Sequence, residues 1–246
     1  MRIQSQIEHA QDTLERIIGD MQHSAAALAR IAADIVPSPQ PGTQGTRLSD
    51  SQRQALQAHI QVALERHAWC HGAGFASYAS PTATDNGYWT LEWWLREAGD
   101  ARQAHLDQSQ EIRQRLDFRT FDWFEQPARR HQPFVDGPYV DYVCNGAYTM
   151  TAAHPVMIDN AFAGVTAVDV LVSTLETLAL PALTTISQPA LVLNSDRRVI
   201  ISTSPDIRTG DLWKTNRLPA CHSKPGIPLQ LVVLDDAPGL PPSGPR

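Results

Sequence analysis

The sequence has few lysines and no cluster of basic residues. Its 246 residues include 20 Lys and Arg against 26 Asp and Glu, which gives a formal net charge of −6. Proteins that bind nucleic acids usually gather positive charge on one face. This acidic balance therefore argues against nucleic acid as a partner.

Cysteine is scarce, and long apolar runs are missing. Cys70, Cys144 and Cys221 are odd in number, far apart and form no Cys-x-x-Cys motif. This pattern argues against a disulfide scaffold and favours a reducing compartment. No window approaches the roughly 18 apolar residues of a membrane helix. The N-terminus also lacks the apolar run of a signal peptide. We therefore expect a cytoplasmic protein without a membrane span.

Aromatic residues, by contrast, are concentrated in the middle of the chain. The sequence has six Trp, and four of them are Trp89, Trp93, Trp94 and Trp123. Large aromatic side chains at this density fill a bulky core or line a cavity. The sequence alone leaves both interpretations open.

Residues 3–36 show the clearest helical pattern. Apolar residues recur there at alternating steps of four and three, Ser24 is the one break, and Pro37 ends the run. The positions are Ile3, Ile7, Ala10, Leu14, Ile17, Met21, Leu28, Ile31 and Ile35. A heptad seam of this kind typically packs on one partner helix, which predicts a homodimer. The alternative is a long helix that lies on its own domain.

The rest of the chain alternates between strand and helix patterns. A linker rich in Pro and Gly covers 37–47, and a second helix is expected to begin at Ser49 or Ser51 and to end near His67. Strands are predicted at 72–78, 146–158, 162–169 and 229–234, with a helix at 170–180 and a hairpin over 190–203. Residues 88–94 fit either a strand or a short helix.

Residues 121–180 carry the chemistry of most interest, since an aromatic-rich turn precedes three strand-like runs. Tyr139 and Asp141 are two residues apart, so a strand would place both side chains on one face. Asp169 follows a similar alternation. Two carboxylates accept short, charge-assisted hydrogen bonds from a protonated amine. Trp123 and Tyr139 would add cation–π attraction. The pattern predicts a site for a ligand with an ammonium group.

Residues 119–170 resemble a Cache sensor domain of the double type, and the weaker resemblance extends over about residues 1–235. It implies a long first helix and two PAS-like modules in tandem, of which the distal one holds the ligand. Members that bind amino acids have an Arg two residues before a Trp-Tyr pair, then Tyr-x-Asp, then a later Asp. In those members the second Tyr and the two Asp hold the ammonium group. Tyr139, Asp141 and Asp169 match these positions.

The carboxylate half of the family pattern is altered. Trp123 matches the Trp, but Phe124 replaces the first Tyr and lacks its hydroxyl. Phe121 stands at the position of the Arg, and the nearest arginine is Arg119. We therefore expect an amine ligand, namely a biogenic amine, a polyamine or an amino-acid-like compound whose acid end is held loosely. Tyr148 is a further candidate contact, although the face of its strand that meets the ligand is left open.

The resemblance gives an α+β fold with a long N-terminal helix and two PAS-like antiparallel-sheet modules, the second of them reduced. The expected boundaries are 1–47 for the long helix and linker, 48–181 for the ligand-binding module, 182–235 for the smaller module and 236–246 for a disordered tail. No cofactor is expected.

Simpler interpretations exist for each candidate residue. Asp169 fits the N-cap of the following helix, Asp141 fits a solvated strand position, and Trp123 fits plain core. A zinc site at His67, Cys70 and His71 would need about four ligands, of which the distant Cys221-His222 pair is the one other source. A nucleophilic role for Cys144 with His154 lacks a third partner.

The prediction is a sensory small-molecule-binding protein, not an enzyme, that signals through an unknown partner. The alternatives are a small enzyme of unfamiliar type that uses the same pocket, and a structural protein that dimerises through its first helix.

Overall fold

The computed structural model describes residues 2–40, 45–79, 88–104, 117–142, 146–214 and 221–234. The chain divides into two compact units, one of residues 18–175 and one of residues 1–17 with 176–246. Each unit has one antiparallel sheet, so the predicted α+β class is confirmed. The domain boundaries predicted from the sequence remain a proposal, and the predicted tail at 236–246 lies outside the described residues.

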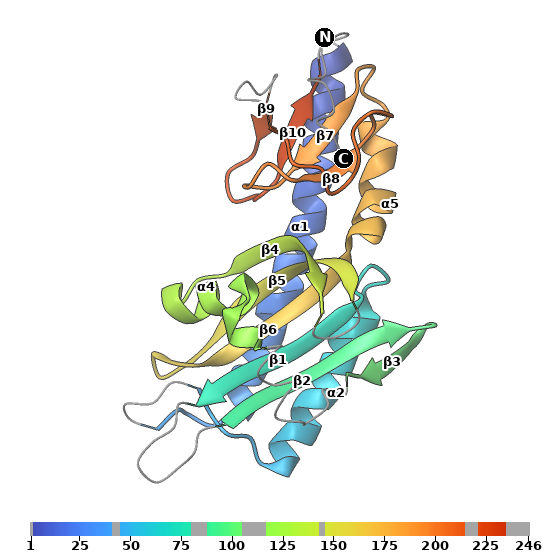
Figure 1. The fold of residues 1–246 in the computed structure, drawn as a ribbon. Coiled ribbons are helices and arrows are strands. Elements are labelled where there is room, and N and C mark those ends of the chain that lie inside the picture. The colour runs from blue at the N-terminus through green and yellow to red at the C-terminus, as the bar shows by residue number, and fades with distance from the viewer. Residues whose placement is uncertain are drawn as a thin grey trace. The chain divides into compact units, whose positions relative to one another are not determined.

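The larger unit is built on a six-stranded sheet in the order β3-β2-β1-β6-β5-β4 (Figure 1). Every neighbouring pair is antiparallel. The strands are β1 (Gly72–Ala79), β2 (Tyr88–Glu97), β3 (Asp100–Gln103), β4 (Phe134–Asp141), β5 (Ala147–Ile158) and β6 (Ala161–Leu171). The predicted strands at 72–78, 146–158 and 162–169 are thus confirmed, and residues 88–94 form a strand, not a helix. The central strands β1 and β6 carry the most deeply buried residues.

The hairpin between β5 and β6 turns where the sequence predicts. Asp159 and Asn160 both have positive φ values, of 50° and 63°. Asp and Asn adopt this left-handed conformation more readily than other residues that carry a side chain. The turn fixes the register of β5 against β6, and that register sets which residues of the two strands share a face.

Helix α2 (Asp50–Arg66) begins at the predicted N-cap. The Ser49 hydroxyl accepts a hydrogen bond from the Gln52 amide, and the Gln52 side chain accepts one from the Ser49 amide. This reciprocal capping box satisfies amides that the first turn leaves without helical partners. Leu56, Ile60 and Leu64 are buried where α2 packs against β1 and β2. α2 therefore covers one face of the larger sheet.

Helix α1 (Arg2–Ile35) matches the predicted first helix, but its buried face does not follow a strict heptad. From Ile7 to Met21 the buried positions include the predicted seam, and beyond Ser24 they shift by one residue, although Leu28 is still buried. Ala25, Leu28, Ala32 and Val36 are buried, whereas Ile31 and Ile35 are half-buried. This drift is that of a straight helix with 3.6 residues per turn. It supports packing of α1 on its own chain, and homodimerisation stays a prediction.

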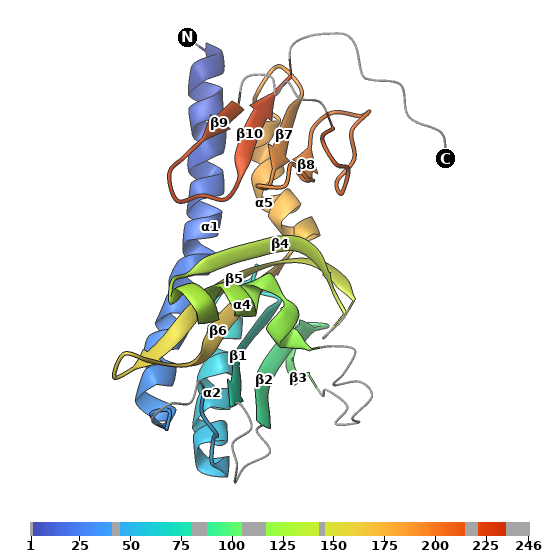
Figure 2. The same cartoon turned by 60° about the vertical axis from the view of Figure 1, so that its left-hand side comes forward.

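In the larger unit, Ala25 of α1 lies against the same face of the sheet as α2, since its carbonyl oxygen accepts a hydrogen bond of 3.0 Å from the Thr166 hydroxyl of β6. Figure 2 shows α4 (Asp122–Arg130) on the other face, in front of β5 and β6. The two faces of the sheet therefore have different roles, one covered by α1 and α2 and one by α4.

The segment expected to be an aromatic-rich turn is a 3-10 helix, η1 (Phe118–Thr120), followed by α4. The N-cap residue of α4 is Phe121, whose side chain makes no capping hydrogen bond. The capping hydrogen bond comes from Asp136 of β4, whose carboxylate accepts a 3.1 Å hydrogen bond from the Trp123 amide. A cap supplied from another strand leaves no local signal in the sequence, which is why this helix was missed.

The smaller unit contains a four-stranded sheet in the order β8-β7-β10-β9. Its strands are β7 (Ala190–Leu193), β8 (Val199–Ser202), β9 (Cys221–Ser223) and β10 (Gln230–Val233), and α5 (Val172–Leu183) leads into it. The predicted hairpin and last strand are confirmed. The turn of the hairpin is held by the Asn194 side chain, which accepts hydrogen bonds from the Asp196 and Arg198 amides. Within this unit Lys224 forms ion pairs with Asp12 and Glu15 of α1.

Candidate functional site

Asp169 is the most deeply buried carboxylate on the face of the larger sheet that α4 covers. The alternation of β6 places it on the same face as Val165 and Ala167, as expected. Only 2% of Asp169 is exposed. It lies inside β6 and α5 begins at Val172, so the interpretation of Asp169 as a helix N-cap is wrong.

Both oxygens of Asp169 accept hydrogen bonds from uncharged donors. The Thr151 hydroxyl donates to Oδ1 over 2.6 Å, and the Trp93 indole N–H donates to Oδ2 over 3.2 Å. The Thr151 oxygen in turn lies 2.7 Å from the Tyr139 hydroxyl. Residues from β2, β4, β5 and β6 thus form one continuous polar chain across the sheet. Sequence analysis missed Thr151 and Trp93, because the strand register that brings them to Asp169 depends on tertiary structure.

Asp141 is the second buried acid of this face. It ends β4 and is 5% exposed, so the interpretation as a solvated strand residue is wrong. Its charge lies close enough to Asp169 to raise the pKa of that carboxyl. Burial raises the pKa of the Tyr139 phenol well above its usual value, and the charges of Asp169 and Asp141 add to the effect. The charges of Asp141 and Asp169 therefore both act on the Tyr139 phenol.

The Asp169 carboxyl has a pKa of about 7, against an ordinary value of 3.8. The largest cause is removal from water, followed by repulsion from Asp141. The hydrogen bonds from Thr151 and Trp93 lower this pKa but do not offset burial. Within the described residues, no ion pair involves Asp169. An ionised carboxylate in this state is stabilised by any cation that reaches it.

The segment before β1 lies beside the two acids. The His71 amide donates to the Asp169 carbonyl oxygen over 2.9 Å, and burial lowers the pKa of the His71 imidazole while the charge of Asp141 raises it. Burial and then the charge of Asp169 raise the pKa of the Cys70 thiol to about 12. Cys70 is therefore a protonated thiol at neutral pH, and it donates to the Gly72 carbonyl oxygen. Among the described residues, no group of three or more His, Cys, Asp or Glu side chains is placed to hold a metal ion.

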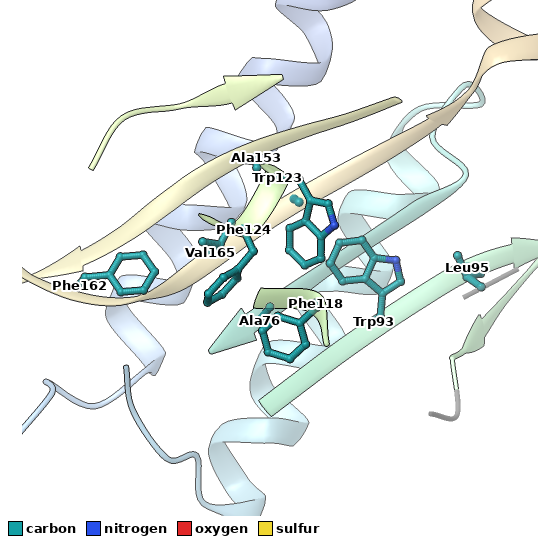
Figure 3. Close-up of a cluster of buried hydrophobic side chains, with 10 residues drawn as sticks. Ala76, Trp93, Leu95, Phe118, Trp123, Phe124, Ala153, Phe162 and Val165 are labelled. Carbon is teal, nitrogen blue, oxygen red and sulfur yellow. The ribbon is translucent and has the colours of Figure 1, made fainter. Parts of the chain in front are cut away.

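An aromatic cluster borders the acids on the same face (Figure 3). The Trp93 and Trp123 rings lie 5.4 Å apart, and Phe118 contacts both Trp123 and Phe124. In Figure 3 the indole nitrogens of Trp93 and Trp123 point toward the Leu95 side. Trp123 is buried as a core residue, as the simpler interpretation requires. Trp93 belongs both to this aromatic cluster and to the hydrogen bonds of Asp169, so the two are physically continuous.

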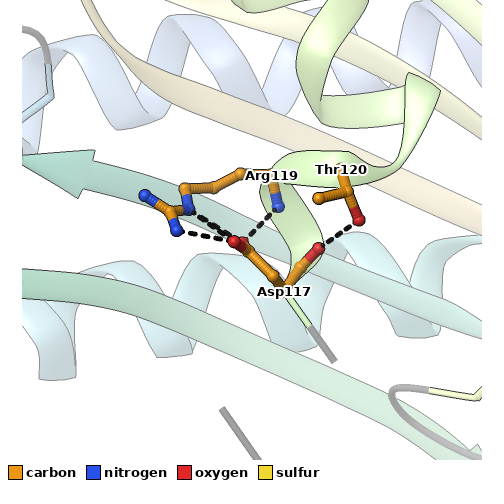
Figure 4. A network of polar contacts seen from close by, with 3 residues as sticks. All are labelled: Asp117, Arg119 and Thr120. Carbon is orange, nitrogen blue, oxygen red and sulfur yellow. Dashed lines mark hydrogen bonds and ion pairs between the residues drawn. The ribbon is translucent and has the colours of Figure 1, made fainter. Parts of the chain in front are cut away.

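Arg119 lies at another end of the same face. Its guanidinium donates to both oxygens of Asp117, at distances of 2.6–3.0 Å (Figure 4). The same group stacks on the rings of Tyr78 and Trp89, 4.2 and 4.6 Å from their centroids. Arg119 is therefore paired and held by its neighbours.

The structure brings together the acids and Tyr139, and it places Trp123, Phe124 and Phe121 in or against the aromatic cluster. The Phe121 and Tyr139 rings are 5.8 Å apart. Tyr148 differs from the other candidates. It alternates with Thr149 and Thr151 along β5, so it lies on the opposite face of the strand from the residue that binds Asp169.

The sequence from 100 to 177 matches the family described as methyl-accepting chemotaxis protein-like, first PDC sensor domain. No curated protein sequence matches the chain. The matched segment contains α4, β4, β5 and β6, and hence both buried acids.

Several solved structures share the fold at low sequence identity. One is a methyl-accepting chemotaxis protein X, with a TM-score of 0.61, 14% identity, and coverage of 94% of this chain and 95% of that one. Another is the sensory domain of the Campylobacter jejuni chemoreceptor Tlp3 with isoleucine bound, with a TM-score of 0.57, 16% identity, and coverage of 94% and 89%. The extracellular domain of a protein described as the histidine kinase soHK1S-Z6 has a TM-score of 0.64 and 15% identity, and the match covers 92% of this chain and 89% of that one. The predicted resemblance to Cache sensor domains is thus confirmed at the level of fold.

The raised pKa of Asp169 predicts a pH-dependent stability of the larger unit. Between pH 3.8 and about 7 the folded protein keeps a proton that the unfolded chain loses. The free energy of unfolding should therefore fall as pH rises through this window, by on the order of 4 kcal/mol. Tryptophan fluorescence in denaturant titrations at several pH values measures it.

Asp169→Asn removes this titration and should flatten the profile over the same window. The Thr151 hydroxyl can turn and donate to Tyr139, so the amide still satisfies both of its neighbours. An unchanged slope in this variant would show that Asp169 is not the titrating group.

The absence of a side chain at Gly72 is also required. A Cβ there would stand 2.5 Å from Oδ2 of Asp169, closer than atoms tolerate. Gly72→Ala should therefore displace the carboxylate and lower the melting temperature. The matched control is Gly19→Ala in α1, where a Cβ meets nothing within 4 Å and helix propensity improves by up to about 1 kcal/mol. Equal melting temperatures for the two variants would contradict this account of Gly72.

Proposed function

We propose that this chain, which has the double Cache fold, is the ligand-binding part of a sensor and recognises a small molecule by its ammonium group. The observation that carries the proposal is the pair of buried acids, Asp141 and Asp169. Burial and then the charge of Asp141 raise the pKa of Asp169, and uncharged donors bind the Asp169 carboxylate.

An ammonium group fits the chemistry of this region. Two ionised carboxylates close together and out of water repel each other, and a single cation between them relieves both the repulsion and the desolvation. An ammonium group has three donors and no acceptor, so carboxylate oxygens are its natural partners. The ring of Trp123, 5.4 Å from that of Trp93, would add cation–π attraction of about 0.5–2 kcal/mol to a cation over its face.

The comparisons support the ligand class only in part. The Campylobacter jejuni Tlp3 domains were solved with L-valine, isoleucine and related compounds, each of which has an amino group. The resemblance assigns the ammonium-binding role to the positions of Tyr139, Asp141 and Asp169. Of these, Tyr139 and Asp169 are connected through Thr151 in this fold. Amine recognition in this chain is our proposal.

An enzymatic role receives less support. The pair Cys144 and His154 was the candidate nucleophile and base, and Cys144 lies outside the described residues. His154 alternates with Ala153 and Thr151 along β5, so it lies on the face opposite the residue that binds Asp169. The matched family and the solved neighbours are sensor domains. We therefore propose binding without turnover, with the signal passed to a partner protein.

Oligomeric state and compartment also remain proposals. Within the described residues no helix is long and apolar enough to cross a membrane. The solved kinase neighbours are extracellular domains, whereas the cysteine pattern of this chain favours the cytoplasm. We keep the cytoplasmic placement and the homodimer as expectations.

The ligand proposal predicts that an amine library contains compounds that raise the melting temperature and bind saturably by calorimetry, without product formation. Asp141→Asn and Asp169→Asn should each weaken binding at least about tenfold, the loss of one charge-assisted contact. Affinity should also rise with pH through about 7, because the ammonium group binds the ionised form of Asp169.

The matched control is Asp159→Asn. This substitution removes the same charge from an exposed turn. Asp159 has a positive φ, a conformation that Asn also adopts well, so affinity should not change. N-acetylated counterparts of the binding amines should not bind. A library in which acidic compounds bind and amines do not would overturn the proposal, as would full affinity in Asp169→Asn.

The homodimer expectation predicts that light scattering gives twice the chain mass at micromolar concentration. Ile3 is exposed and lies on the sequence seam, so Ile3→Glu should lower the fraction of dimer while the melting temperature stays unchanged. A monomer at all accessible concentrations would show that α1 serves only its own chain.

A further inference from the structure

We propose that the Asp117–Arg119 ion pair limits the site to amines without a second charge, an inference that rests on the function proposed above. The pair lies on the same face of the larger sheet as Asp169. Because Asp117 and Arg119 neutralise each other, neither is available to a charged group of a ligand. The ligand class is thereby narrowed from amines in general to monoamines with an uncharged, apolar body.

The two charged regions lie at opposite ends of the aromatic cluster. Asp169 receives the indole N–H of Trp93, whereas Arg119 stacks on Trp89. These two Trp are four residues apart in β2, so their Cα atoms are about 13 Å apart at the usual rise of a strand. The rings of Phe118 and Trp123 lie between the two regions. This distance is too long for the α-carboxylate of an amino acid held at Asp169.

Arg119 is already neutralised where it lies. Three of its N–H···O contacts go to the two oxygens of Asp117, the bidentate geometry in which guanidinium and carboxylate pair best. The Asp117 oxygen also accepts the Arg119 amide, so the pair is anchored to the backbone of η1. A carboxylate arriving here would have to displace Asp117, and a second ammonium group would have to displace Arg119.

Arg96, which lies near Cys70 and His71, is also occupied. Arg96 donates to the carbonyl oxygens of Leu64, His67 and Cys70, at the end of α2 and just beyond it. Asp136 lies near Tyr139 and caps the N-terminus of α4, where the helix dipole favours its charge. Asp169, which makes no ion pair with any of the described residues, is therefore a place with a strong demand for an additional charge, and that charge is positive.

The side chains between the two ends are apolar, and those of Phe118, Trp123 and Trp93 are buried. The partly buried side chains that pack on the cluster from its edges are aromatic or aliphatic, namely Tyr78, Trp89, Leu91, Ala104, Phe121, Ala128, Tyr139 and Met157. An alkyl or aromatic body gains about 25 cal/mol for each Å² that it buries on such a surface. A charged group placed there would lose its hydration without a partner.

The test compares three compounds of equal chain length, hexylamine, hexamethylenediamine and ε-aminocaproate, together with their octyl homologues, by calorimetry on the full chain. Wild type should bind the monoamine at least about tenfold more tightly than the diamine or the amino acid. Asp117→Asn retains the backbone cap but frees Arg119, so the longer amino acid should gain affinity about tenfold. Arg119→Gln frees Asp117, so the longer diamine should gain by a similar factor.

The double variant Asp117→Asn/Arg119→Gln has no charge at this end and should restore the wild-type preference. Glu125→Gln removes one partner of the exposed Glu125–Arg129 pair of α4 and should leave all preferences unchanged. Circular dichroism verifies that each variant folds. If one single variant fails to fold, the other still tests the inference with the opposite sign of charge.

Outcomes separate this inference from the function that it rests on. Equal binding of the three compounds by wild type, or unchanged preferences in both folded single variants, overturns the role of Asp117 and Arg119 while amine binding stands. Absence of binding by every amine overturns the proposed function itself, and the inference falls with it. Opposite shifts in the two single variants support the inference.

Discussion

The burial of the Asp169 carboxylate is the constraint on which the rest of the larger unit depends. A carboxylate taken out of water needs donors, and Thr151 and Trp93 supply them from two other strands of the same sheet. Gly72, opposite Asp169 on β1, supplies the space. The donors are uncharged, so they satisfy hydrogen bonds without compensating the charge. An isolated charge in this state is costly for stability and favourable for binding a cation.

The same sheet separates support from recognition. α1 and α2 pack on one face, where the buried Glu92 carboxylate is paired with Arg53 and Gln57 of α2. On the opposite face, Asp169 makes no ion pair with any of the described residues. Two buried carboxylates in one sheet are thus treated differently. This contrast is why we propose a structural role for Glu92 and a ligand-binding role for Asp169.

Local periodicity predicted most of the elements and part of the site. Alternation within β4 and β6 was enough to place Tyr139, Asp141 and Asp169, because side-chain direction in a strand depends on position alone. The partners of Asp169 were not predictable, since Trp93 is 76 residues away and meets it through strand register. α4 was missed because its cap comes from Asp136. The heptad in α1 suggested a partner helix, whereas its drift after Ser24 fits packing on one chain.

Charge, more than shape, explains how such a site would choose its ligand. Aromatic and aliphatic surfaces discriminate weakly between apolar bodies, since each additional methylene contributes only about 0.8 kcal/mol. A group that is charged and unpaired after burial loses several kcal/mol. In our proposal, a face with the buried Asp169 carboxylate at one end and the neutral Asp117–Arg119 ion pair at the other selects a ligand by its charge before its length. The proposed role of Asp117 in this selection needs no contact with the ammonium group, because its ion pair occupies Arg119.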